Sequence, residues 1–367
     1  MRRRWLTLLL LPAGLALLAV GVGDWLADCR IRMHTIVRLD GPASPEVLRL
    51  DGLELSLTGS RIREVRPDGV VVVRAWAPNP AVRVVEPGDR DEVRLRIENV
   101  PWRGRLAASG PVEETRTGPS RSLRFSPRLT RRLAFAVPDA EVTFAVLGDT
   151  GVGPTFPEAL RGAAADGADF LLHVGDLIYE DEQIPAIERI LAEAPLPVFV
   201  VRGNHDYRNR ARIDFMRALG PPYYTFPIGG ATFIVLDNAG DYLPWLWRRS
   251  TQYRWWTEAL GAPRDGPLFV AMHKPIFDRR GGNWAGMGDQ AFGRRLLSDF
   301  VRAGVDAVFT GHVHATHLWI EDGIPFVVNG EGYESRTGPE KHRMGWVHVR
   351  GWDVRIEQVP IWKRGAP

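Results

Sequence analysis

Five short polar motifs, each at the end of an apolar run, constrain the fold of this chain more than any other feature. The runs have the length and composition of buried β-strands, and glycine lets the backbone turn sharply in four of the motifs. Because the carboxyl ends of strands in an open α/β sheet meet at one edge, the polar side chains are expected to project into one crevice. The motifs are Gly148–Gly151, Gly175–Tyr179, Gly203–Asp206, Val270–His273 and Gly311–His314.

Each motif has an ordinary explanation when taken alone. A Gly-Asp pair after a strand is usually a turn, Asn204 and His205 suit the cap of a following helix, and His273 suits a protein core. His312 and His314 are two residues apart, so in a strand they would share one face. Recurrence at five strand ends favours a ligand site instead. Since the chain has one cysteine in 367 residues, the ligand atoms of such a site would be oxygen and nitrogen, which suit iron, manganese or zinc.

The surrounding pattern predicts two domains after an N-terminal segment, residues 1–30. Residues 31–137 hold short alternating segments between Pro and Gly clusters, which predict a small all-β sandwich with a long loop over 111–132. In residues 138–367, apolar strands alternate with helical stretches, which predicts an α/β layered domain. Its expected strands include Val142–Leu147, Phe170–Val174, Val198–Val201, Phe233–Leu236, Leu268–Met272, Val305–Thr310 and Phe326–Val328.

The N-terminus has the features of an export signal. Arginines at positions 2–4 precede an apolar run, Trp5–Val22, which is just long enough to span a bilayer once. No A-x-A cleavage site follows, so the alternatives are an uncleaved anchor, a cleaved signal, a lipidated Cys29 or a buried core helix. The first three export the chain from residue 30 onwards, since arginines favour the cytoplasmic side. We expect an exported protein that contacts a membrane through this segment.

A second segment has a composition suited to membranes. Tyr242–Arg249 places Trp245 and Trp247 beside paired arginines, which favour the headgroup region and anionic lipid respectively. Three alternatives remain open for it: packing on the β domain or against neighbouring tryptophans, a dimer contact, or insertion into a membrane surface.

The net charge of +3 is unevenly distributed along the chain. Residues 31–137 carry 19 arginines and 13 acidic residues, whereas residues 138–367 carry 24 basic and 29 acidic residues. No long basic run is present, so a dedicated nucleic-acid partner is not expected. An anionic substrate therefore needs a local positive centre in the second domain, and metal ions would supply one.

The five motifs, in this order, resemble those of the calcineurin-like metallophosphoesterases, and specifically the purple acid phosphatase branch. The superfamily has Asp-x-His in the first motif; here Gly151 takes the third position, and Tyr179 completes Gly-Asp-x-x-Tyr in the second. The resemblance covers roughly residues 140–330. It implies a four-layer metallophosphoesterase sandwich of the α/β (α+β) class, and the preceding all-β domain is similar to that of plant-type members.

The resemblance also implies a role for each motif residue. Iron(III) at a first site would be bound by Asp149, Asp176, Tyr179 and His314. Asp176 would bridge to a second metal (iron, zinc or manganese), which would also be bound by Asn204, His273 and His312. His205 would stabilise the transition state or protonate the leaving group, and Asp206 would orient His205.

The implied activity is acid-phosphatase-like hydrolysis of phosphate monoesters by a hydroxide held on the metals. Two alternatives remain: a phosphodiesterase acting on nucleotides or lipid head groups, and an inert binding module of the same fold. Intact ligands in all five motifs argue against the inert module. The sequence leaves the physiological substrate, the second metal and the oligomeric state open.

Overall fold

The computed structural model describes residues 45–138, 141–207, 211–240, 251–282, 285–332 and 342–361. The predicted signal or anchor, Cys29 and the tryptophan-rich segment Tyr242–Arg249 lie outside these residues. Among the helices of the described ranges, none is both long and apolar enough to cross a membrane. The described residues belong to one compact unit.

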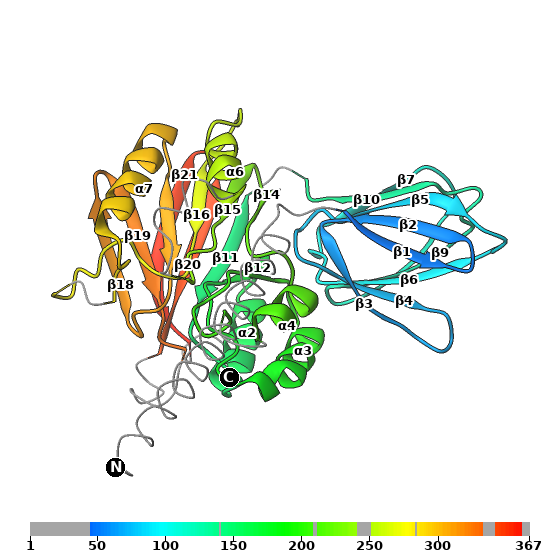
Figure 1. Ribbon diagram of the computed structural model, residues 1–367, viewed down its shortest axis with the longest axis horizontal. Coiled ribbons are helices and arrows are strands. Elements are labelled where there is room, and N and C mark those ends of the chain that lie inside the picture. Colours follow the sequence, from blue (N-terminus) through cyan, green and yellow to red (C-terminus); the bar gives the residue numbers. More distant parts are fainter. Residues whose placement is uncertain are drawn as a thin grey trace, which may run out of the picture. The chain divides into compact units, whose positions relative to one another are not determined.

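The first part of this unit is a sandwich of two five-stranded sheets (Figure 1). Alternating apolar residues such as Leu53, Leu55 and Leu57 fill the space between the sheets, as their period of two predicts. One sheet has the order β1 (Glu46–Leu50), β2 (Leu53–Thr58), β5 (Ala81–Pro87), β10 (Arg132–Ala136), β7 (Arg105–Ala108). The other has the order β3 (Ser60–Val65), β4 (Val71–Ala75), β6 (Val93–Glu98), β9 (Ser120–Phe125), β8 (Glu113–Thr117).

The predicted long loop over 111–132 is wrong. Most of it is the antiparallel hairpin of β8 and β9, which turns at Gly118 with a φ of 54°. Leu123 and Phe125 of β9 enter the sandwich core. Exposed polar residues such as Ser122 and Arg124 stand between the core positions of β9, so they hid the strand alternation.

The second part contains two mixed sheets whose parallel strands carry the polar motifs. The five-stranded sheet has the order β13 (Val198–Val200), β12 (Phe170–His173), β11 (Val142–Leu147), β20 (Arg343–Arg350), β21 (Asp353–Pro360). The six-stranded sheet has the order β14 (Tyr224–Ile228), β15 (Ala231–Val235), β16 (Leu268–Ala271), β17 (Ala307–Thr310), β19 (Ile324–Asn329), β18 (Thr316–Glu321). Strands β11 to β13 are parallel to one another, as are β15, β16, β17 and β19.

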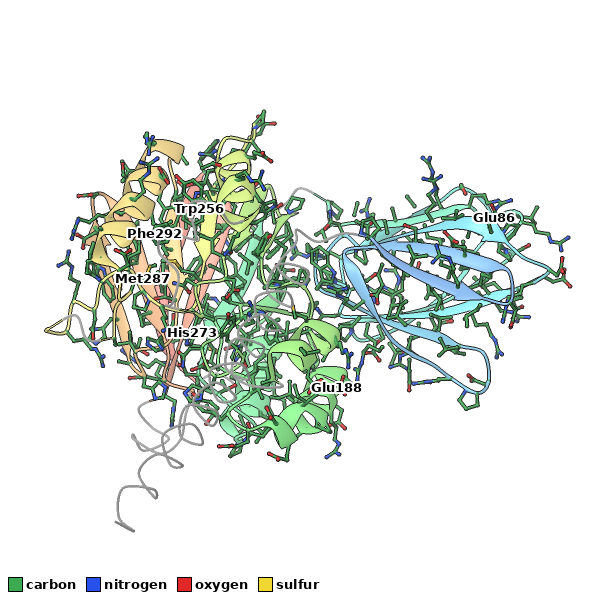
Figure 2. All side chains as sticks on the ribbon, viewed as in Figure 1. Glu86, Glu188, Trp256, His273, Met287 and Phe292 are labelled. Atoms are coloured by element: carbon green, nitrogen blue, oxygen red, sulfur yellow. The ribbon has the colours of Figure 1, made fainter. Side chains whose placement is uncertain are left out.

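These two sheets pack face to face through a phenylalanine-rich core. Phe144 stacks on Phe170 at 4.9 Å between ring centroids and meets Phe233 edge-on at 5.2 Å. A separate core lies under each outer layer of helices, and in one of them Trp256 stacks on Phe292 at 5.9 Å (Figure 2). The four-layer metallophosphoesterase-type sandwich predicted from the sequence is therefore confirmed.

The helices cover the outer faces of the two sheets. The five-stranded sheet is covered by α2 (Thr155–Ala165), α3 (Ile184–Glu193) and α4 (Ala211–Ala218), which alternate with strands along the chain as the sequence pattern predicts. The six-stranded sheet is covered by α6 (Thr251–Leu260) and α7 (Gln290–Ala303). A short 3-10 helix, η1 (Asp181–Gln183), precedes α3.

The sandwich binds the edge strand β13 through two buried polar side chains. Asn99, whose φ is 69°, accepts a hydrogen bond from the Val198 N–H at 2.7 Å and donates one to the Val198 carbonyl at 3.0 Å. Arg74 donates to the same carbonyl at 3.1 Å, and burial lowers the pKa of Arg74 to about 10. The Asn99 amide therefore occupies backbone groups of the strand that leads to Gly203–Asp206.

Candidate metal centre

The polar motifs converge at the carboxyl ends of the parallel strands. Asp149 follows β11, Asp176 follows β12, and His312 and His314 follow β17. All four have a positive φ, between 49° and 65°, and they are four of the seven non-glycine residues with such backbone in the described ranges. Left-handed backbone is unfavourable for residues with a Cβ and concentrates at functional sites.

This backbone corrects the expectation that His312 and His314 share one face of a strand. Strand β17 ends at Thr310, and both histidines lie beyond it in the left-handed turn. The main-chain N–H of His312 donates to both carboxylate oxygens of Asp149, at 3.1 and 2.9 Å. The turn therefore directs the two histidines to different sets of ligand atoms.

The first set contains Asp149, Asp176 and His314. One potential ligand atom from each lies within 4.8 Å of the others. His314 Nε2 lies 3.4 Å from Asp149 Oδ1. Both carboxylates are almost fully buried, and burial raises the pKa of Asp149.

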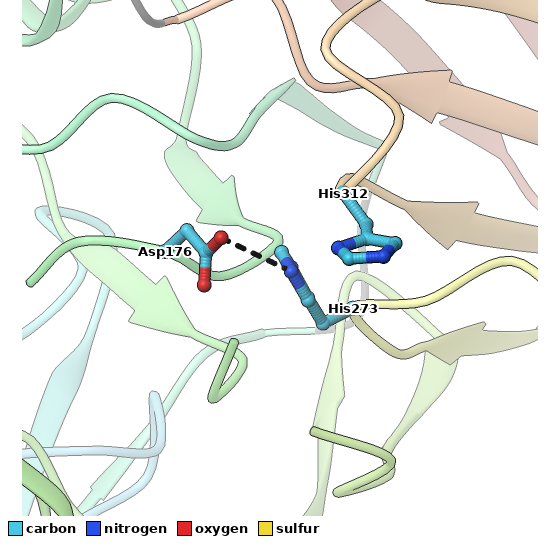
Figure 3. A group of neighbouring side chains, drawn as sticks. All are labelled: Asp176, His273 and His312. Atoms are coloured by element: carbon cyan, nitrogen blue, oxygen red, sulfur yellow. Dashed lines mark ion pairs between the residues drawn. The ribbon is translucent and has the colours of Figure 1, made fainter. Parts of the chain in front are cut away.

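The second set contains Asp176, His273 and His312, again with one potential ligand atom from each within 4.8 Å of the others. Figure 3 shows the Asp176 carboxylate directed at the His273 ring, with His312 beside that ring. His273 Nε2 lies 3.4 Å from Asp176 Oδ2. Asp176 belongs to both sets, so it occupies the position that a bridging ligand requires.

His273 shows how this arrangement suits a cation. Its Nδ1–H donates to the Val174 carbonyl at 2.8 Å, which directs Nε2 towards Asp176 and towards Asn204 Oδ1, 3.0 Å away. Among the protein groups alone, burial opposes the charged imidazole, but the Asp176 carboxylate outweighs it and raises the pKa of His273 to about 9. An Asp176 oxygen and the Asn204 oxygen thus both lie near the proton on His273 Nε2. A metal ion bound here would displace that proton.

Electrostatics within the sets follow from the same contacts. Burial alone would raise the pKa of Asp176, but the charge and hydrogen bond of His273 hold it below its ordinary value. Burial, assisted by the neighbouring His273 charge, lowers the pKa of His312 to about 3. His312 is therefore a neutral imidazole, which is the form that binds metals. Imidazole nitrogens and carboxylate oxygens suit iron, zinc or manganese.

Two glycines make room for the carboxylates. A Cβ on Gly203 would lie 2.1 Å from Asp176 Oδ1, and a Cβ on Gly311 would lie 2.5 Å from Asp149 Oδ2. Since such approaches are shorter than any van der Waals contact, no other residue fits either position without displacing a carboxylate. Gly203 and Gly311 are the glycines of the third and fifth sequence motifs.

Asp206 has different partners from those predicted. Its carboxylate accepts backbone hydrogen bonds from Asp176 and Gly203 at Oδ2 and from Ile178 at Oδ1, each at 2.8 Å. It is fully buried, and burial together with the Asp176 charge raises the pKa of Asp206 to about 7. Asp206 therefore joins the backbone of two ligand-bearing turns, in place of the predicted contact with His205.

His205 lies beside the ligand sets and is partly exposed. Its main-chain N–H donates to Asp176 Oδ1 at 2.8 Å, and its ring lies 4.3 Å from the Tyr179 ring between centroids. A Cβ on Gly151 would lie 3.1 Å from the Tyr179 ring, which is tighter than most real contacts. The paired occurrence of Gly151 and Tyr179 thus has a steric reason, because the glycine leaves space for the tyrosine.

Two supporting side chains were not assigned to the site from the sequence. His173, the last residue of β12, is fully buried; its Nδ1 accepts from the Gly175 N–H at 3.3 Å, and its Nε2 lies 2.9 Å from Thr150 Oγ1. Burial lowers the pKa of His173 to about 3, so it remains neutral. Asn238 binds the backbone of His273, and its signal was present: it follows the apolar run Phe233–Leu236, as the five motifs follow theirs.

Comparisons with known proteins agree with this geometry. Residues 142–316 match the family model described as calcineurin-like phosphoesterase. Human serine/threonine-protein phosphatase CPPED1 is 28% identical over 169 residues, which cover 40% of this chain and 53% of that protein. Probable purple acid phosphatase 20 of Arabidopsis thaliana is 25% identical over 217 residues, which cover 52% of this chain and 49% of that protein.

The matched regions are partial on both sides, since the chain spans about half the length of these curated relatives. Among solved structures, purple acid phosphatase PPD1 from yellow lupin seeds is similar over 85% of this chain and 73% of its own. The TM-score is 0.53 at 14% sequence identity, so the likeness is one of fold.

Proposed function

We propose that the chain hydrolyses phosphate monoesters at a centre of two metal ions, since residues 142–316 match the calcineurin-like phosphoesterase model and are similar to a purple acid phosphatase. The observation that carries this proposal is the pair of ligand sets that share Asp176. One carboxylate common to two nitrogen- and oxygen-rich sets is the arrangement that places two cations side by side.

When bound, two cations would polarise the phosphoryl oxygens and lower the pKa of water at the site. The protein contributes the positions of the groups around them. Asp149 and Asp176 supply negative charge that is buried and held by backbone N–H groups. His205 is partly exposed beside Asp176, which suits it to stabilise the transition state or to give a proton to the leaving oxygen.

We assign iron(III) to the first site and iron, zinc or manganese to the second. Support for iron(III) comes from Tyr179, whose ring packs against His205 and lies close to Gly151, and whose hydroxyl oxygen is buried. A trivalent cation lowers the proton affinity of a phenol more than a divalent one does, and so favours tyrosinate. Export remains a proposal that rests on the N-terminal segment alone.

Hydrolysis of simple esters by purified full-length protein tests the function. The metal-loaded protein is expected to contain two metal ions per chain and to hydrolyse p-nitrophenyl phosphate faster than bis(p-nitrophenyl) phosphate. A preference for the diester would favour the alternative phosphodiesterase. Two bound metals with no hydrolysis of either ester would favour the inert binding module, and absence of metal would contradict the proposal.

Tyr179→Phe tests the identity of the first metal. The variant is expected to lose a visible charge-transfer absorption band while it remains folded, because phenylalanine cannot provide a tyrosinate ligand. Visible absorption and circular dichroism measure the two properties on one sample. Tyr253→Phe on α6 is the matched control and is expected to keep the band. An active parent protein without the band, or an unchanged band in Tyr179→Phe, would exclude the iron(III)–tyrosinate assignment.

A further inference from the structure

A buried arginine lies immediately before the third motif. Arg202, between β13 and Gly203, has no solvent-exposed surface. Its guanidinium forms an ion pair with Asp237 and lies 5.0 Å from the centre of the Tyr207 ring. Arg202 is two residues from Asn204 in the sequence, so whatever fixes the guanidinium also restrains the turn that carries Asn204.

The partner of Arg202 belongs to a turn at the end of β15. Gln252 of α6 accepts a hydrogen bond from the Asp237 N–H at 2.7 Å and donates one to the Asp237 carbonyl at 2.9 Å. Asp237 Oδ1 in turn accepts from the Ala239 N–H at 3.2 Å. The Gln252 side chain and the Asp237 carboxylate therefore both fix the backbone of this turn.

The next residue in this turn binds the fourth motif. Asn238 Oδ1 accepts from the N–H groups of His273 and Lys274, both at 3.0 Å, and Asn238 Nδ2 donates to the Lys274 carbonyl at 2.7 Å. One buried amide thus makes three hydrogen bonds to the backbone at a ligand residue. All of these bonds connect the turn after β15 with the turn after β16.

We propose that Arg202, Asp237 and Asn238 are positioning residues that set the separation of Asn204 and His273, and thereby the affinity of the second metal site. The inference rests on the proposed function, since it assumes that cations bind the two ligand sets. Asn204 and His273 lie in the turns that follow β13 and β16, and the side chains of Arg202, Asp237 and Asn238 connect these two turns. Asp149 and His314, which belong to the first set only, make none of the described contacts with these three residues.

The use of a buried ion pair supports a geometric role. Removing two charges from water is costly, and apolar residues of similar volume often stabilise a protein as well or better. What an ion pair adds is direction, because guanidinium and carboxylate meet only in a few orientations. The ion pair is therefore expected to determine the position of the Asn204 turn and to contribute little to the stability of the domain.

Two variants separate positioning from stability. Arg202→Met with Asp237→Asn removes both charges, keeps the apolar stem of Arg202 and keeps an oxygen for the Ala239 N–H. Asn238→Ser keeps the ion pair but shortens the side chain that holds His273 and Lys274. Asp299→Asn on α7 is the control, because it neutralises another buried aspartate that is paired with arginine, outside the ligand sets.

Titration of the chelator-treated full-length proteins with Mn²⁺ alone gives the main measurement. Both variants are expected to bind one Mn²⁺ with the affinity of the parent and the second about 10- to 100-fold more weakly, as for other losses of groups that orient metal ligands. The control is expected to match the parent. Equal weakening of both Mn²⁺ ions, or two unchanged affinities in a folded variant, would overturn the proposal.

Hydrogen exchange of the chelator-treated proteins gives a readout that does not involve metal. In Asn238→Ser, the amides of His273 and Lys274 are expected to exchange about tenfold faster, as for the loss of one hydrogen bond. Unchanged exchange there would overturn the proposal even if the double variant fails to fold. If the parent neither contains metal as purified nor binds Mn²⁺, the proposed function fails, while exchange still decides whether Asn238 holds the His273 turn.

Discussion

Asp176→Ala is expected to remove both metal ions and to lower kcat/KM by about 10⁴-fold or more, since the cations supply several kcal/mol of transition-state stabilisation. The reason is geometric: Asp176 is the one residue common to both ligand sets, and it also accepts the His205 N–H. Elemental analysis and initial rates on the same preparation measure the two effects.

Asp169→Ala provides the control for this change. Asp169 is a buried aspartate beside Arg103 that belongs to neither ligand set, so its loss is expected to affect stability and leave the metal content unchanged. If Asp176→Ala kept two metals per chain, Asp176 would not be the bridge, and the binuclear arrangement would need another shared ligand.

His205→Ala is expected to lower kcat by about 10²–10⁴-fold, the range for loss of a group that transfers a proton or stabilises charge. Both metals should remain, because the bond to Asp176 comes from the main-chain N–H of residue 205, which alanine retains. Elemental analysis, together with kcat and KM for p-nitrophenyl phosphate, gives the required data.

His317→Ala is the matched variant for this test, since His317 lies on β18 near Trp319 and outside both ligand sets. It should retain the rate and the metal content of the parent. Loss of metal from His205→Ala as complete as that from Asp176→Ala would mean that His205 is a ligand, and the division between ligand and catalytic residue would be wrong.

The strands and the meeting of the five motifs could be predicted because both depend on local patterns. An apolar run followed by a polar turn is visible in the sequence, and the geometry of a sheet brings the ends of parallel strands together. The hairpin of β8 and β9 was missed because its local pattern is weak. Its core positions, Leu123 and Phe125, are few and stand among arginines that look like loop residues.

Contacts between distant residues could not be predicted in the same way. The family resemblance implied that Asp206 orients His205, yet its carboxylate accepts hydrogen bonds from backbone N–H groups some 30 residues earlier in the chain. Asn238 binds His273 across 35 residues. The left-handed backbone at Asp149 and Asp176 also escapes a sequence pattern, because it is imposed by the surrounding packing and not by residue type.

The hydrogen bonds of the Asn99 amide affect which fragments of this protein can be produced. Strand β13 is the edge of its sheet, and at Val198 its outward N–H and C=O are occupied by a side chain from the sandwich. A fragment that lacks the sandwich would present this edge bare, and open edges recruit other strands and promote aggregation. The predicted boundary between residues 137 and 138 is thus a poor place to divide the chain, and the second domain is best produced with the sandwich attached.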